Sequence, residues 1–270
     1  MKLKKKLLNH DLTVGSWITI GNPIVAEIMA QAGFDWLTID MEHSAITLDI
    51  TQDLIRIIEL HGVPPLVRVG HNEPNLIKRV MDAGAEGVVV PMVNSKINAE
   101  KAVSSVKYPP VGFRGVGLAR AQKYGADFEE YRKLNQENSI VIVQIEHIDA
   151  VNNLEEILSV KGIDGFIVGP YDLSGSMGFP GQFDHPDVKK ALMHIESTAQ
   201  SLNVLSGFHV ISPEINAVKE KLKHGYRFIA HSLDILFLGE ACRNSVKSCN
   251  DMIKECSYNK FPIFSGVPNL

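Results

Sequence analysis

Short apolar runs recur along this chain at intervals of roughly 25–35 residues, separated by segments with helical spacing. The runs are rich in β-branched residues, which is typical of strands that are buried on both faces of a parallel sheet. Strands are therefore expected at residues 14–19, 35–40, 64–69, 87–91, 140–145, 163–168, 203–208 and 227–231.

The segments between these runs carry apolar residues at helical spacing, and glycines at positions 33, 62 and 84 mark plausible helix ends. Eight strands that alternate with helices predict an α/β fold, a (β/α)8 TIM barrel. A doubly wound sheet is the alternative, but no glycine fingerprint follows the first strand. Helices are expected at 23–33, 48–62, 73–84, 95–106, 127–136, 149–160, 186–202, 212–224 and 232–250.

The chain has 270 residues, 45% of them hydrophobic, and a formal net charge of −4. One domain is expected over residues 1–270, with the barrel at about 12–245 and a C-terminal extension at about 246–270. The near-neutral charge gives no general attraction to nucleic acid or to anionic membrane. The basic start MKLKKKLLNH lacks the apolar core of a signal peptide, and no apolar run is long enough for a membrane span. A cytoplasmic protein is expected.

Three cysteines, Cys242, Cys249 and Cys256, are spaced by seven residues. On one helix they form a stripe that rises about 10 Å per step, which is too far for a disulfide within the helix. Zinc binding is disfavoured because the spacing brings no ligands close together. The stripe is interpreted as a packing surface, whereas the tail KFPIFSGVPNL after it has no assigned role.

The longest irregular segment covers residues 107–126 and joins the fourth strand to the fifth. Its glycine, proline and arginine content predicts a long loop, which is expected at the mouth of the barrel. Long loops inside compact domains are often functional.

Polar residues stand where the predicted strands end, which is the place where barrel enzymes build their active sites. The fifth and sixth strands run into Glu146 and Asp172, and a carboxylate at the end of a buried strand is costly unless its charge is compensated. A shared Mg²⁺ or Mn²⁺ ion provides such compensation. The alternative is that each carboxylate caps a helix or pairs with an arginine. Further polar residues at strand ends are Asp40, Glu42, His43, Arg68, Gln144, His147, Gly169 and His231.

His43 is the candidate acid or base, because an imidazole exchanges protons near neutral pH. Arg68 lies within the apolar run LVRV, so it is expected to face an anion or a developing oxyanion. For Arg68 the alternative is an internal salt bridge with Asp40 or Glu42. For His43 it is an ordinary surface or core histidine.

The loop GPYDLSGSMG is expected to open a short helix whose backbone N–H groups bind a substrate carboxylate. No predicted strand ends in a lysine, which disfavours a Schiff-base mechanism. A metal-stabilised enolate fits better. The remaining histidines show no metal-binding spacing and are interpreted as structural or exposed: His10, His61, His71, His185, His194, His209 and His224.

The chain resembles the HpcH/HpaI aldolase family, the class II pyruvate aldolases, which include 4-hydroxy-2-oxoheptanedioate and 2-dehydro-3-deoxyglucarate aldolases. The likeness covers about residues 12–245. It rests on WLTIDMEHSAITLD, RVGHNEPNLIKRVMDAGAEGVVVPMV, KYPPVGFRGVG, VQIE, VGPYDLSGSMGFPG and HPDV.

The resemblance implies a TIM barrel that assembles as a homohexamer, a trimer of dimers, with C-terminal helices exchanged between subunits. It implies Mg²⁺ or Mn²⁺, with Co²⁺ or Zn²⁺ as further options, bound by Glu146 and Asp172. By the same resemblance Arg68 stabilises the enolate oxygen, His43 is the acid or base, and Asp82 supports it from a neighbouring subunit. The residues that match the substrate-binding positions are Gln144, Gly169, Pro170 and Ser174.

The implied reaction is reversible cleavage of a 4-hydroxy-2-oxo acid to pyruvate and an aldehyde, which makes the protein a carbon–carbon lyase. The alternatives are another enolate-forming lyase, acting on an acyl-CoA or as a decarboxylase, and a barrel that binds a keto acid without catalysis. His147 departs from the small hydroxyl residue that is usual after QIE. The sequence therefore predicts an altered aldehyde pocket or metal surroundings there.

Overall fold

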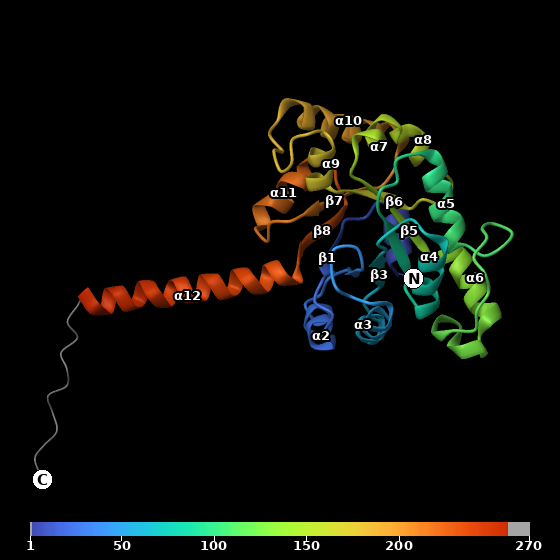
Figure 1. Ribbon diagram of the computed structural model, residues 1–270, viewed down its shortest axis with the longest axis horizontal. Coiled ribbons are helices and arrows are strands. Elements are labelled where there is room, and N and C mark those ends of the chain that lie inside the picture. Colours follow the sequence, from blue (N-terminus) through green and yellow to red (C-terminus); the bar gives the residue numbers. More distant parts are fainter. Residues whose placement is uncertain (1, 259–270) are drawn as a thin grey trace, which may run out of the picture. The chain divides into compact units, whose positions relative to one another are not determined.

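The structure is a computed structural model that describes residues 2–258. It divides into two compact units, Met1–Asp234 and Ile235–Leu270. The first unit contains eight parallel strands that close into a barrel in chain order, as Figure 1 shows with helices around them. This confirms the predicted TIM barrel. The strands are β1 (Thr13–Ile18), β2 (Trp36–Asp40), β3 (Pro65–Arg68), β4 (Gly87–Val90), β5 (Ile140–Ile145), β6 (Gly165–Val168), β7 (Ser206–Val210) and β8 (Phe228–Leu233).

The helices follow the predicted alternation. Where one long helix is expected at 149–160 the structure has two short ones, divided at Asn153, whose backbone leaves the helical region. The helices of this unit that lie between strands are α2 (Pro23–Gln31), α3 (Leu48–Leu60), α4 (Pro74–Ala83), α5 (Lys96–Val106), α6 (Phe128–Asn138), α7 (Ile148–Asn152), α8 (Leu154–Leu158), α9 (Pro170–Ser176), α10 (Pro186–Leu202) and α11 (Ile215–Lys223).

The helix α1 (Lys2–Leu8) has no counterpart among the predicted elements. Its Leu3 and Leu7 are buried in the core, and its lysines reach residues that immediately precede strands. Lys4 bonds to the Ser139 carbonyl and pairs with Asp164, and Lys6 pairs with Asp35 at 2.6 Å. The helix therefore closes the end of the barrel where the strands begin.

The segment 107–126 lies away from the barrel mouth, so the expected position was wrong. It follows α5 and therefore starts at the end of the barrel where strands begin, and it contains a short 3-10 helix, η1 (Arg120–Gly125). Buried Arg114 pairs with Asp82 near the end of α4, and Arg120 donates to the Ala83 carbonyl at 3.0 Å. Loops that follow a helix in this fold lie opposite the catalytic face.

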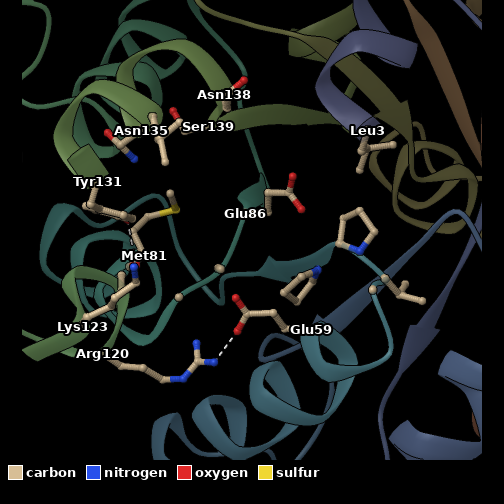
Figure 2. A pocket seen from close by; sticks show the side chains of 18 of the residues that line it. Leu3, Glu59, Met81, Glu86, Arg120, Lys123, Tyr131, Asn135, Asn138 and Ser139 are labelled. Atoms are coloured by element: carbon tan, nitrogen blue, oxygen red, sulfur yellow. Dashed lines mark hydrogen bonds and ion pairs between the residues drawn. The ribbon is translucent and has the colours of Figure 1, made fainter. Parts of the chain in front are cut away.

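A cavity of about 950 Å³ occupies this same end of the barrel. Figure 2 shows its lining from α1, the end of α3, η1 and α6, with Arg120 paired to Glu59 at one side. Its walls include residues that precede or begin strands, such as Asp35, Pro65 and Ser139. This cavity is therefore separate from the polar residues at the strand ends.

Helix α12 (Asp234–Tyr258) begins at the last residue of the first unit and is the element that the structure describes in the second. Cys242 and Cys249 are exposed free thiols on this helix, and the Cys256 side chain and the tail lie outside the described residues. The cysteine packing surface remains a prediction. No helix within residues 2–258 is long and apolar enough to cross a membrane.

Candidate active site

Asp40 and Arg68 are the last residues of neighbouring strands and stand directly opposite each other in the register. Arg68 Nε donates to Asp40 Oδ1 at 2.8 Å and Nη2 donates to Oδ2 at 2.6 Å, a bidentate pair of two buried side chains. Asp40 Oδ1 also accepts from the Glu42 N–H at 3.0 Å and the His43 N–H at 3.3 Å. The internal salt bridge that the sequence left open is thus present, and it fixes the guanidinium and the turn after β2.

The pairing of Asp40 with Arg68 determines the charge of both groups. Burial alone raises the pKa of a carboxyl group, but the hydrogen bonds and charge of Arg68 outweigh it and hold the pKa of Asp40 below its usual value. Arg68 also lies over the ring of Trp17, 4.4 Å from its centroid. Asp40 and Arg68 therefore both stay charged.

Glu42 connects Arg68 to His43. Its Oε2 lies 3.2 Å from Arg68 Nη1 and 3.9 Å from His43 Nε2. Burial raises the pKa of Glu42 to about 7; Arg68 opposes this shift, and the carboxylates of Asp40 and Asp172 add to it. The His43 side chain is 63% exposed, so it is accessible to a ligand from solvent.

Glu146 follows β5 and is buried. Its Oε1 accepts from the Met92 N–H at 2.7 Å, and its Oε2 accepts from the Gln144 side-chain amide. Met92 has a φ of 52°, a left-handed conformation that non-glycine residues rarely adopt. The segment after β4 is therefore held in a strained conformation in which its N–H bonds to Glu146.

Glu146 has no cationic hydrogen-bond partner comparable to that of Asp40. Burial raises its pKa to about 7, its hydrogen bond from Met92 opposes the shift, and the nearby charges of Glu42 and Asp172 raise it further. Three carboxylates thus act on one another at the ends of β2, β5 and β6. A divalent cation bound among them would offset both the cost of burial and the mutual repulsion.

The β6 end approaches this carboxylate closely. A Cβ added to Gly169 meets Glu146 Cβ and Oε2 at 3.0 Å and Gln144 Nε2 at 3.1 Å, so only glycine fits without displacement. Gly169 also caps α9, whose first turn carries the exposed Asp172. The sequence GPYD therefore brings the second carboxylate beside the first.

Carboxylate oxygens suit Mg²⁺ or Mn²⁺, and two of them leave coordination positions for water and substrate. The residues fit such an ion: Glu146 and Asp172 are hard donors, and the buried Oε1 of Gln144 has no hydrogen-bond partner within residues 2–258. No group of three His, Cys, Asp or Glu side chains within the described chain is arranged to hold a metal. Glu146 and Asp172 are therefore a set of two protein ligands, which leaves the remaining coordination positions to water and substrate.

Asp82 does not lie beside the other candidate site residues of the same chain. It stands near the end of α4, where it pairs with buried Arg114 and accepts from Gln122 Nε2 at 3.3 Å. The structure of one chain therefore gives Asp82 an intrachain role, and its role in a neighbouring site stays a prediction.

Ser174 and His147 both organise the chain locally. The Ser174 hydroxyl donates to the Tyr171 carbonyl at 2.9 Å and accepts from the Gly181 N–H at 3.0 Å, which holds the loop after β6. His147 caps α7, since its Nδ1 accepts from the Asp149 N–H at 3.1 Å. Serine and threonine hydroxyls commonly cap helices in this way, so the imidazole takes over a task typical of a small hydroxyl residue.

Sequence reasoning gave no role to Trp17, named Glu42 only as a possible salt-bridge partner of Arg68, and interpreted His209 as structural or exposed. Glu42 stands in the DMEH segment, so its place beside His43 was available from the sequence. Trp17 and His209 come from β1 and β7, and their ring centroids lie 5.0 Å apart. Only the closed barrel brings these two together, and the sequence carries no local signal of it.

Comparison with known proteins identifies the family. The model of the HpcH/HpaI aldolase/citrate lyase family matches residues 13–241. A 5-keto-4-deoxy-D-glucarate aldolase from Escherichia coli (strain E24377A) is 37% identical over 237 residues, which cover 87% of this chain and 91% of the relative.

Solved structures agree. An HpcH/HpaI aldolase/citrate lyase family protein from Burkholderia cenocepacia is 32% identical, with a TM-score of 0.88 over 92% of this chain and 99% of the other. The citrate synthase SbnG is 26% identical, with a TM-score of 0.83 over 93% and 98%. These findings confirm the resemblance and the expected class of enzyme, a carbon–carbon lyase. The chain belongs to the HpcH/HpaI aldolase/citrate lyase family.

Proposed function

We propose that this protein is a divalent-metal-dependent aldolase that cleaves a 4-hydroxy-2-oxo acid reversibly to pyruvate and an aldehyde. The observation that carries the proposal is the pairing of two unlike halves. Asp40 and Arg68 form a fixed, ion-paired side that presents a guanidinium, and Glu146 and Asp172 form an anionic side in which neither carboxylate has an ion-pair partner within residues 2–258. A bound 2-oxo acid uses both, because its keto oxygen gains negative charge during cleavage.

Glu146 and Asp172 are the residues that would hold the ion, which would supply Lewis acidity for the bound 2-oxo acid. Arg68, fixed by Asp40, donates a hydrogen bond to the oxygen on C2. The first turn of α9, after Gly169 and Pro170, offers backbone N–H groups to the substrate carboxylate. The amide of Gln144 orients Glu146 and the bound acid.

His43 accepts the proton of the C4 hydroxyl, directly or through one water. The C3–C4 bond then breaks, the aldehyde leaves, and the electron pair moves toward the oxygen on C2. Protonation at C3 yields pyruvate. Glu42 Oε2 lies between the two side chains, 3.9 Å from His43 Nε2 and 3.2 Å from Arg68 Nη1, so the proton acceptor and the oxyanion donor share one acidic neighbour.

We propose a homohexamer, a trimer of dimers with α12 exchanged between subunits, in which Asp82 assists His43 of a neighbouring subunit. Asp82 lies beside Gly117, and Val116 and Leu118 are exposed apolar residues on the same segment. Exposed apolar residues around a functional side chain favour a subunit contact. Mixing inactive Arg68→Ala chains with inactive Asp82→Asn chains is expected to restore activity, because mixed assemblies contain intact sites; no recovery would contradict the shared site.

The second candidate is another carbon–carbon reaction through the same 2-oxo acid site, on an acyl-CoA or by decarboxylation. The similarity to the citrate synthase SbnG supports this second candidate. If the substrate is an acyl-CoA, we expect the protein to be retained on immobilised CoA and to turn over an acyl-CoA. Neither result is expected of the aldolase.

The test is an assay of pyruvate release from a panel of 4-hydroxy-2-oxo acids that includes 5-keto-4-deoxy-D-glucarate, the compound named in the E. coli relative. Release is expected with Mg²⁺ or Mn²⁺, loss of release in EDTA, and recovery when the ion is restored. No release from any substrate with metal present would overturn the aldolase proposal.

A further inference from the structure

Three strands meet at Ser232, close to the ends of β1, β7 and β8. Ser232 has a φ of 52°, in the left-handed region, and the pairing of β1 with β8 shifts between Gly15 and Trp17. A non-glycine residue keeps such a conformation only when its surroundings hold it, and such positions cluster at functional sites. The Ser232 hydroxyl donates to the Ile211 carbonyl at 2.9 Å, which ties β8 to the residue after β7.

The carbonyl of Ser232 accepts two side chains. Ser16 Oγ donates to it at 3.3 Å, and Nε2 of His209 lies 3.4 Å away. A carbonyl oxygen only accepts, so the imidazole places its proton on Nε2 and leaves Nδ1 as an acceptor. The bulge in β8 thus selects the orientation of the His209 ring.

The ring so fixed packs against Trp17. The two ring centroids lie 5.0 Å apart with an angle of 31° between the planes. Trp17 Nε1 is buried and has no hydrogen-bond partner in the described part of the chain, so packing positions this indole. Arg68 lies over the same indole at 4.4 Å. A chain of contacts therefore runs from Ser232 through His209 and Trp17 to the guanidinium.

His209 is suited to this place as an uncharged ring. Burial lowers the pKa of His209 to about 3, and the charge of Arg68 lowers it further, whereas the Ser232 carbonyl and Asp40 oppose the shift. A protonated imidazole here would repel Arg68, so the ring contributes shape and one hydrogen bond rather than charge.

We propose that His209 is a positioning residue of the active site, which holds Trp17 and through it the Arg68 guanidinium in the orientation that meets the reacting oxygen. This inference rests on the proposed role of Arg68 at the C2 oxygen. It explains why a histidine tied to the β8 bulge stands among the apolar side chains of β7.

Three substitutions separate the two contributions of the ring. His209→Leu removes both the hydrogen bond and the aromatic contact, and we expect it to lower kcat about tenfold or more. His209→Phe keeps an aromatic ring without the hydrogen bond, and His209→Gln keeps a donor to Ser232 without the ring. Both are expected to lose less activity than His209→Leu. His194→Leu, an exposed histidine on α10, is the matched control and is expected to leave kcat unchanged.

A spectroscopic measurement reports on positioning independently of turnover. The chain has two tryptophans, and Trp36 is fully buried and stacked on Phe228. Acrylamide quenching of tryptophan fluorescence is therefore expected to increase in His209→Leu because Trp17 loosens.

His209→Leu with kcat within twofold of wild type and unchanged quenching would overturn the inference. If His209→Leu does not fold, unchanged kcat and quenching in both His209→Phe and His209→Gln have the same consequence. An inactive wild type would overturn the proposed function instead, and the quenching result would then still decide whether His209 positions Trp17.

Discussion

The two sides of the candidate site solve the problem of buried charge in opposite ways. At the ends of β2 and β3, Asp40 and Arg68 neutralise each other through a bidentate pair, and the pKa of Asp40 is lowered. At the ends of β5 and β6, Glu146 accepts hydrogen bonds but forms no ion pair within residues 2–258, and its pKa is raised to about 7. One side is electrostatically complete, whereas the other needs a cation to be stable while ionised. The difference supports the proposal that an ion binds between Glu146 and Asp172.

Removal of the anionic side is expected to have the largest effect. Glu146→Gln keeps the size of the side chain but removes its charge, so we expect pyruvate release to fall about 100-fold or more. The measurement is kcat/KM at saturating Mg²⁺. Glu156→Gln, at an exposed position on α8, is the control and is expected to retain activity. Near wild-type activity in Glu146→Gln would contradict the proposal that Glu146 is a metal ligand.

Loss of the Asp40–Arg68 pair is expected to lower the stability of the protein. Asp40→Asn leaves Arg68 buried without its bidentate partner, and we expect a loss of about 3 kcal/mol in the free energy of unfolding. Urea titration measures this loss. The exposed pair of Asp53 with Arg56 provides the comparison, and Asp53→Asn is expected to cost less than about 0.5 kcal/mol. Equal losses in the two variants would contradict a buried, structural pair.

A smaller effect is expected at the glycine beside Glu146. Gly169→Ala places a methyl group against Glu146 and Gln144, so we expect metal affinity to fall about tenfold through displaced ligands. Gly175→Ala is the matched control, because a Cβ there meets nothing within 4 Å. Equal metal affinities in the two variants would show that the close approach at Gly169 is unimportant.

The smallest effect is the pH dependence of stability without metal. The pKa values of Glu42 and Glu146 are about 7, above the ordinary value of 4.5, so the native state binds these protons more tightly than the unfolded chain does. In EDTA, their contribution to the unfolding free energy therefore decreases as pH rises from 4.5 to about 7 and is level above that. Asp40, whose pKa is lowered, contributes with the opposite sign at lower pH.

Denaturation in EDTA at several pH values measures this slope, and Glu146→Gln is expected to make it shallower because one of the two groups is gone. An equal slope in wild type and Glu146→Gln would show that Glu146 does not titrate as proposed.

Most of the barrel was predictable because buried parallel strands are continuous apolar runs. The predicted strand at 140–145 coincides with β5, and the predicted strand at 203–208 begins three residues before β7. The helix α1 was missed because Leu3 and Leu7 lie in a lysine-rich segment. Only the folded structure shows that these leucines are buried in the core. The segment 107–126 was assigned to the barrel mouth because of its glycine, proline and arginine content. Its position after a predicted helix already indicated the opposite end, where strands begin.

The site was predictable as far as it depends on strand ends. Asp40, Arg68 and Glu146 were found because a charge inside or directly after an apolar run is conspicuous. The sequence left open whether Arg68 pairs internally, since that depends on the register of β2 against β3. The contacts among Trp17, His209 and Ser232 depend on β1, β7 and β8 closing the barrel, which no local pattern records.

Equilibrium binding of Mn²⁺, followed by electron paramagnetic resonance of the free ion, tests most directly that the unpaired carboxylate side is an ion site. Wild-type protein is expected to bind one Mn²⁺ per chain, more tightly when pyruvate is present. Glu146→Gln is expected to bind at least about tenfold more weakly, and Glu156→Gln as tightly as wild type. Equal Mn²⁺ affinity in wild type and Glu146→Gln would contradict the assignment of this side of the barrel as the metal site.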